Sequence, residues 1–133
     1  MNNSHMASEK LLQAIRFVNE AKRAYEEGDN FGVVIRAYQA VQRLSQFLLN
    51  LYGFYVTDNP SLRLFLVPDT SEAVKAFKAK LVDLERRLHF SYMVEESSLI
   101  NSVNIRGSEV KSLVDLLGGL VDEAYKIYDE FHN

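Results

Sequence analysis

Residues 30–52, NFGVVIRAYQAVQRLSQFLLNLY, decide the fold class of this chain. Apolar side chains recur there every three or four residues, the spacing that places them on one face of an α-helix. Polar side chains follow the same spacing on the opposite face, and Phe47 and Leu49 widen the apolar one. The stretch therefore predicts a long helix that is the most buried of the molecule. Its apolar face consists of Val34, Ala37, Tyr38, Val41, Leu44, Leu48 and Leu51.

Three further segments, residues 8–27, 70–96 and 108–131, have the same periodicity and one apolar stripe each. At about 1.5 Å per residue, helices of this size are about 30–40 Å long. Helices of similar length with mostly short connections bury their stripes by packing antiparallel around a shared seam. We therefore predict an all-α fold, an antiparallel up-and-down four-helix bundle.

Capping residues mark several ends of these segments. Ser8 is a good N-cap for the first helix, and Gly28 can adopt the left-handed conformation that ends it. Asp69 and Glu72 have the spacing of a capping box at the start of the third helix. These residues predict where the helices begin and end.

The connection between the second and third helices, residues 54–67, is apolar for a loop. We expect a short extra helix or a packed apolar loop there, with Pro60 in the first helical turn. No repeat or second unit is visible, so residues 8–133 are predicted to form a single domain. Residues 1–7 resemble a vector-derived leader, and we leave them, with His5, out of functional reasoning.

The composition excludes several classes of protein. A chain that is 47% hydrophobic and 25% charged is globular, and the absence of cysteine excludes disulfides, thiolate metal sites and a cysteine nucleophile. No apolar run approaches the roughly 20 residues that span a bilayer, which predicts a cytoplasmic protein without membrane contact. The excess of acidic over basic residues that gives the net charge of −3 lies in residues 107–133, and this excess disfavours a broad RNA-binding surface.

The sequence offers little catalytic chemistry. A di-metal site in a helical bundle needs inward carboxylates and two Glu-x-x-His pairs. The nearest matches, Glu85 with His89 and Asp129 with His132, differ in spacing or composition. No serine lies in a strand–turn–helix elbow, and no glycine-rich loop resembles a nucleotide fingerprint. We therefore expect no metal, no cofactor and no catalytic residue.

The richest polar cluster is at the end of the third helix, in residues 84–92, LERRLHFSY. It places two guanidiniums, an imidazole and a phenol within about two turns, a combination that can bind a phosphate and stack a base. The alternative is an exposed helix end whose arginines pair with neighbouring carboxylates. The candidate ligand-binding residues are Arg86, Arg87, His89 and Tyr92.

A second candidate is the polar face of residues 30–52. Arginine and glutamine alternate on it at helical spacing, a pattern that can form a dimer interface or line a groove. The solvated side of an amphipathic helix has the same pattern, so both interpretations stay open. The candidate interface residues are Arg36, Gln39, Arg43 and Gln46.

Gly118 and Gly119 lie in the middle of the fourth helix. Each glycine in a helix interior costs about 1 kcal/mol relative to alanine. Close approach of a neighbouring helix would explain the pair, and a kink is the other interpretation.

Two stretches together resemble a known family. Residues 21–29, AKRAYEEGD, end a helix at a glycine-containing turn, and residues 34–44, VIRAYQAVQRL, belong to the next helix. With a third helix in which Arg87 is followed by Tyr92, they are similar to the HEPN superfamily of nucleotide- and RNA-associated helical domains. The resemblance extends over most of residues 9–132. It implies a bundle of four or five helices that forms a homodimer, often with a minimal nucleotidyltransferase as its partner.

Catalytic HEPN members are metal-independent ribonucleases with an arginine, four to six residues and then a histidine. The positions at this spacing before the two usable histidines hold no arginine. They are Leu84, Asp83 and Val82 before His89, and Ile127, Lys126 and Tyr125 before His132. The resemblance therefore implies a member of the non-catalytic branch.

We expect a non-enzymatic HEPN-like domain that binds a nucleotide, RNA or a partner protein, such as a nucleotidyltransferase, as a homodimer. One alternative is a purely structural or adaptor bundle without a small ligand. Another is a degenerate HEPN-type ribonuclease that uses His89 as its acid–base group. The sequence leaves the ligand and the dimer face open.

Overall fold

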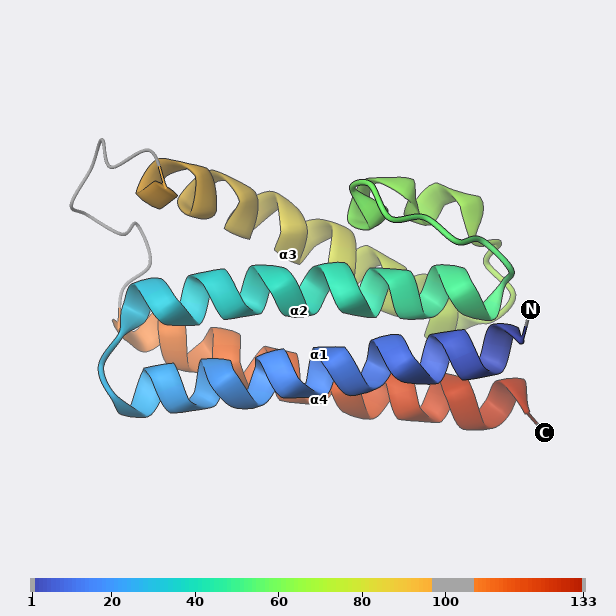
Figure 1. Cartoon of the computed structure of the whole chain (residues 1–133), viewed down its shortest axis with the longest axis horizontal. Helices are drawn as coiled ribbons and strands as arrows, with labels where there is room; N and C mark the ends of the chain where they lie inside the picture. The colour runs from blue at the N-terminus through green and yellow to red at the C-terminus, as the bar shows by residue number, and fades with distance from the viewer. Residues whose placement is uncertain (1, 97–106, 133) are drawn as a thin grey trace.

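The computed structural model describes residues 2–96 and 107–132, with their side chains except those of residues 90–96 and 108. Within these ranges the chain is helical and contains no strand, which confirms the predicted all-α class. Four long helices and a short 3-10 helix follow one another (Figure 1). They are α1 (Asn3–Glu26), α2 (Asn30–Leu51), η1 (Pro60–Leu66), α3 (Glu72–Glu96) and α4 (Gly107–Phe131).

The second helix, α2, is at the centre of the arrangement and contacts all the other helices. α1 lies beside it along most of its length, and α4 runs beside α1 with the two chain ends at one end of the molecule (Figure 1). Every residue of α2 from Leu44 to Leu51 is buried. The wide apolar face of this helix therefore has neighbours on several sides.

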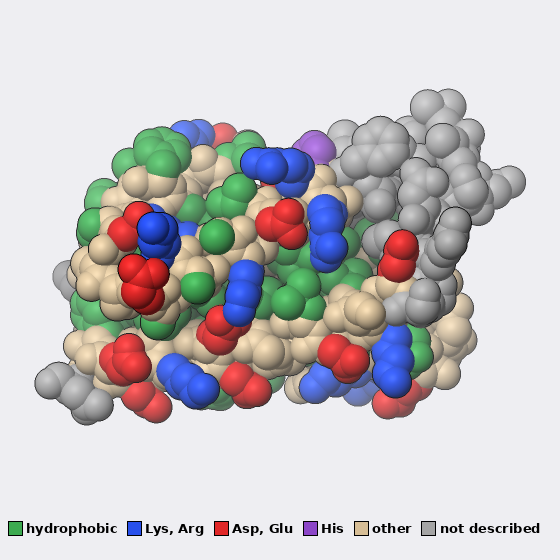
Figure 2. Space-filling view, turned by 180° about the vertical axis from the view of Figure 1, so that it is seen from behind, with side chains coloured by type: hydrophobic (Ala, Val, Ile, Leu, Met, Phe, Trp, Pro, Cys, Tyr) green, Lys and Arg blue, Asp and Glu red, His purple; other side chains and the backbone are tan. Residues whose placement is uncertain are grey.

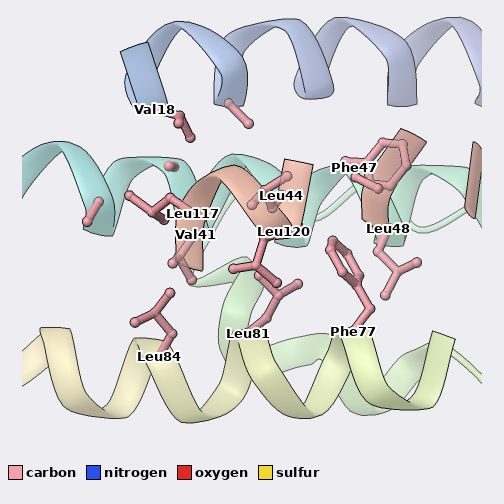
Figure 3. Close-up of a cluster of buried hydrophobic side chains, with 14 of the residues drawn as sticks. Val18, Val41, Leu44, Phe47, Leu48, Phe77, Leu81, Leu84, Leu117 and Leu120 are labelled. Atoms are coloured by element: carbon pink, nitrogen blue, oxygen red, sulfur yellow. The ribbon is translucent and has the colours of Figure 1, made fainter. Parts of the chain in front are cut away.

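The core is built from leucine, valine and phenylalanine side chains of all four long helices, which point toward one another (Figure 3). The rings of Phe47 in α2 and Phe77 in α3 meet edge to face, with their centroids 6.4 Å apart. Edge-to-face contact is a favoured aromatic geometry, and burial of each such side chain contributes about 1.5–3 kcal/mol. This layer joins α3 to the rest of the molecule.

α1 begins five residues before the predicted start at Ser8. The N-cap is Asn2, whose Oδ1 accepts a hydrogen bond of 3.0 Å from the backbone N–H of His5. Ala7 is fully buried, so residues 3–7 extend the helix and its apolar stripe. The origin of residues 1–7 in a vector stays a prediction.

The other helix ends follow the predictions in part. Gly28 has φ of 73°, the left-handed conformation predicted for it. The capping box predicted for α3 is wrong in its first residue, because Ser71 accepts the hydrogen bond from the N–H of Val74 at 3.1 Å. Asp69 instead forms an ion pair with Lys78, whose Nζ lies 2.7 Å from Oδ1. Asp69 therefore ties the connection to α3 rather than capping it.

The apolar connection contains the predicted short helix, and Pro60 is its first residue. η1 contacts α2 and α3, so it covers the flank of the molecule between them. Leu64 and Val67 are buried, whereas Phe65 is 75% exposed. Only one side of this segment therefore joins the core.

α4 runs through Gly118 and Gly119 without interruption. A Cβ atom added to either glycine would have no neighbour within 4 Å in the described residues. The predicted close approach of another helix at these glycines is therefore not found within the described part of the chain.

Candidate functional site

A cluster of three polar side chains joins α2 to α3. Nδ1 of His89 lies 3.3 Å from the hydroxyl oxygen of Tyr38 and 3.3 Å from Oε1 of Glu85. The Tyr38 and His89 rings are tilted, with their centroids 6.0 Å apart. Glu85 and His89 are one turn apart on α3, and Tyr38 approaches them from α2. We call these three residues the Tyr–His–Glu cluster.

The burial within this cluster is uneven. Glu85 is 8% exposed, whereas the side chain of His89 is 53% exposed. A buried carboxylate needs a hydrogen-bond donor, and Nδ1 of the imidazole can supply one when it is protonated. Among the described residues, both contacts of the ring are made through Nδ1. Nε2 is therefore the ring atom available to a ligand.

The two arginines of the predicted site lie on different sides of α3. Arg86 is one turn before His89, so it shares the side of the cluster. Lys80 of α3 forms an ion pair with Glu123 of α4, with Nζ 2.7 Å from Oε1. Arg87 is two helical turns after Lys80, so it lies on the same side of α3, the side that faces α4. Its Nε lies 3.9 Å from Oδ2 of Asp83, and both side chains are exposed.

The fourth residue predicted for the site, Tyr92, is within α3, but its side chain lies outside the described residues. Of the predicted site residues, Arg86 and His89 therefore lie on one side of α3, and the structure adds two residues that were not predicted, Tyr38 and Glu85, in contact with His89. Tyr38 was assigned to the apolar face of its helix. The one-turn spacing of Glu85 and His89 was a signal for their contact, but their association with Tyr38 depends on how α2 and α3 pack.

The polar face of α2 divides into two parts. Arg36 forms an ion pair with Glu20 of α1 (Nε–Oε2, 3.1 Å) and donates a hydrogen bond of 2.9 Å to Oε1 of Gln39. Arg43 makes the same contact with Gln46, at 2.7 Å. Gln46 is 4% exposed, whereas the side chain of Arg36 is 42% exposed. The first pair thus lies at the surface beside α1, and the second extends into the interior.

The buried part of this polar face holds the connection between α2 and α3. Nε2 of Gln46 donates to the carbonyl oxygen of Val56 at 3.1 Å, and Nδ2 of Asn50 donates to that of Phe54 at 3.0 Å. Gln42 donates to Oγ of Ser61 in η1 at 3.1 Å. Amide side chains can satisfy the backbone of a covering segment, so these residues attach the connection to the helix.

The surface carries charges of both signs. On the face seen in Figure 2, lysine and arginine alternate with aspartate and glutamate, and hydrophobic side chains are visible between them. The described part of that face has no broad basic area. A ligand with a single phosphate group suits such a surface better than a long polyanion does, because affinity for a polyanion depends on many cations.

The described residues contain no group of three or more histidine, aspartate or glutamate side chains placed to bind a metal ion. In the same part of the chain, every helix is too short or too polar to cross a membrane. Comparison of the chain with protein-family models, with curated proteins and with solved structures gave no match.

Proposed function

We propose that this chain is a non-enzymatic, HEPN-like antiparallel four-helix bundle that binds the phosphate group of a nucleotide or RNA beside the Tyr–His–Glu cluster. The observation that supports the proposal is the exposed imidazole of His89, held through Nδ1 by Tyr38 and the buried Glu85 at 3.3 Å each. A ring held in this way loses less conformational entropy when a ligand binds.

The phosphate would bind between Nε2 of His89 and the guanidinium of Arg86. The guanidinium can donate two hydrogen bonds to one phosphate, and Nε2 of His89 donates one when both nitrogens of the ring carry a proton. Tyr38 and Glu85 act as positioning residues, because they contact the other nitrogen of the ring. His89 and Arg86 thus supply donors without a metal ion or a broad basic surface.

The test measures binding of fluorescently labelled ATP and of a labelled single-stranded RNA by fluorescence polarisation. Arg86→Ala and His89→Ala should each weaken binding of the preferred probe at least several-fold, since each removes a charge-assisted donor. Preference for one probe distinguishes a free nucleotide from RNA.

Arg87→Ala is the matched control. It removes the same guanidinium from the adjacent position, on the α4 side of α3, and should leave the affinity unchanged within about twofold. No binding of either probe by the wild-type chain, or equal losses for Arg86→Ala and Arg87→Ala, would reject the proposed site and favour the structural or adaptor alternative.

The same contact favours one second candidate, a degenerate ribonuclease. A histidine held by a buried carboxylate at one nitrogen can transfer protons at the other. Cleavage of RNA that is lost in His89→Ala and retained in Arg87→Ala would support this candidate. Purified protein that leaves RNA intact would retire it.

The resemblance to HEPN domains also implies a homodimer and a nucleotidyltransferase partner, and both stay predictions. Their tests are the mass of the chain in solution and its co-purification with a nucleotidyltransferase from the same cell. Neither is needed for the phosphate site, whose described residues lie on α2 and α3 of one chain.

A further inference from the structure

α1 and α4 border a shallow groove of about 300 Å³ on the outer surface of the molecule. The groove is lined by Ile15, Val18, Asn19 and Lys22 of α1 and by Gly118, Val121, Asp122 and Tyr125 of α4. Of these lining residues, Tyr125 is 46% exposed. Leu12, one turn before Ile15, is 62% exposed. Apolar side chains on both helices are thus accessible to solvent along one face.

The two glycines of α4 belong to this face. Gly118 lines the groove, and a Cβ on either Gly118 or Gly119 would have no neighbour within 4 Å. The chain therefore has two helix-interior glycines that its described residues do not require, at a cost of about 1 kcal/mol each. Docking of another helix on α4 would explain them, because glycine lets two helix backbones approach closely.

Charged residues flank the groove in two rows. Arg16 and Arg23 on α1 are seven residues apart, and so are Asp115 and Asp122 on α4. A spacing of seven is about two helical turns, so each pair lies on one side of its helix. All four are exposed, and none is within ion-pair distance of an oppositely charged group among the residues that the structure describes. By helical periodicity, Gly118 and Gly119 lie on either side of the aspartate row.

We infer that this face binds a second copy of the same chain, with α1 of each copy lying antiparallel on α4 of the other. The two rows have opposite charge and equal spacing, which is the complementarity that a self-association about a two-fold axis requires. The exposed apolar side chains of both helices would lie at the centre and the charged rows around them, as in protein interfaces generally.

The register of the two rows agrees with this geometry. Ser4 at the start of α1 contacts His132 after the end of α4, so these residues lie level. Counting along both helices from that contact, Arg16 lies level with Leu120 and Arg23 with Leu113. A two-fold axis parallel to the helices keeps every residue at its own level. Each arginine is then offset by two residues, about 3 Å along the helix axis, from its aspartate on the other copy, and a long arginine side chain can cover an axial offset of this size.

Sedimentation of two charge-reversed variants tests the inference. Arg16→Glu/Arg23→Glu and Asp115→Arg/Asp122→Arg each place like charges opposite one another, so each alone should sediment as a monomer, whereas the wild type sediments as a dimer. An equimolar mixture of the two variants should form a heterodimer, because every pair of rows is then opposite in charge. All four positions are exposed, and circular dichroism checks that the helices are retained.

The matched control is Lys75→Glu/Arg87→Glu, which reverses two exposed charges on α3 and should leave the dimer intact. Gly118→Leu, whose Cβ would have no neighbour within 4 Å among the described residues, should also give a folded monomer. A wild-type chain that sediments as a monomer, reversed variants that remain dimers, or a mixture that stays monomeric would each overturn the inference. None of these results bears on the phosphate site, which is measured separately on α2 and α3.

Discussion

The hydroxyl oxygen of Tyr38 in α2 lies 3.3 Å from Nδ1 of His89 in α3, across 51 residues of sequence. This contact crosses the seam between two helices and ends beside a carboxylate, that of Glu85, which is 8% exposed. The half-exposed imidazole is therefore held by one residue from each helix.

Tyr38→Phe should separate positioning from folding. The substitution keeps the ring and removes the hydroxyl near His89, so the unfolding free energy should fall by about 1 kcal/mol or less. Affinity for the phosphate probe should fall a few-fold, because the imidazole is held less firmly. Polarisation and chemical denaturation of the same sample measure the two effects. Unchanged affinity would remove Tyr38 from the site.

Phe47→Ala should be among the most destabilising single changes in α2. Phe47 is fully buried and contacts Phe77 and Tyr128, whose ring centroids are each 6.4 Å away. Loss of a buried phenylalanine costs about 3–5 kcal/mol. Urea denaturation measures this loss of unfolding free energy, and Phe65→Ala is the control. Phe65 is 75% exposed, and its loss should stay within about 0.5 kcal/mol.

Gln46→Leu should loosen the connection between α2 and α3. The change leaves the carbonyl of Val56 and a guanidinium N–H of Arg43 without the partner that Gln46 now provides. A fully buried unsatisfied group costs about 1–3 kcal/mol, and these part-buried groups should cost less than that each. Hydrogen exchange should show faster exchange in residues 53–67 than in the wild type. Gln39→Leu, at the half-exposed end of the same polar face, should leave that exchange unchanged.

Gly28→Ala should destabilise the chain by about 1–2 kcal/mol. Gly28 has φ of 73°, and a side chain there clashes with the backbone although the surrounding space is open. Gly28→Asn should cost less, because asparagine tolerates this conformation better than alanine does. Thermal denaturation of the two variants checks the order. If both variants were as stable as the wild type, the left-handed backbone conformation of Gly28 would not explain the preference for glycine there.

Much of the fold could be predicted from local patterns. The period of residues 30–52 specified a buried helix, and Gly28 and Pro60 marked a helix end and a helix start that the structure confirms. The start of α1 was placed too late, because Ser8 resembles a cap and the helical residues before it have no strong apolar pattern. The cap of α3 was also misplaced. Asp69 and Ser71 both resemble caps, and the ion pair of Asp69 with Lys78 is a tertiary contact.

The candidate site was predictable only in part. Arg86, Arg87 and His89 could be read as one cluster, but the sequence does not state which side of α3 faces α2 and which faces α4. Packing places His89 beside Tyr38 of α2, and it places Lys80, two turns before Arg87, beside Glu123 of α4. The polar face of α2 was similarly ambiguous, since a glutamine that faces solvent and one that anchors a covering segment look alike in sequence.

The sequence by itself determined the helical class, the order and approximate lengths of the helices and the burial of α2, because these depend on the spacing of apolar side chains along one chain. Only the tertiary structure decided that Tyr38 lies beside His89 and that Gln46 supports the connection. It also showed that a Cβ on Gly118 would meet no described neighbour within 4 Å. Those relations join residues far apart in sequence, and their geometry is set by how the helices pack.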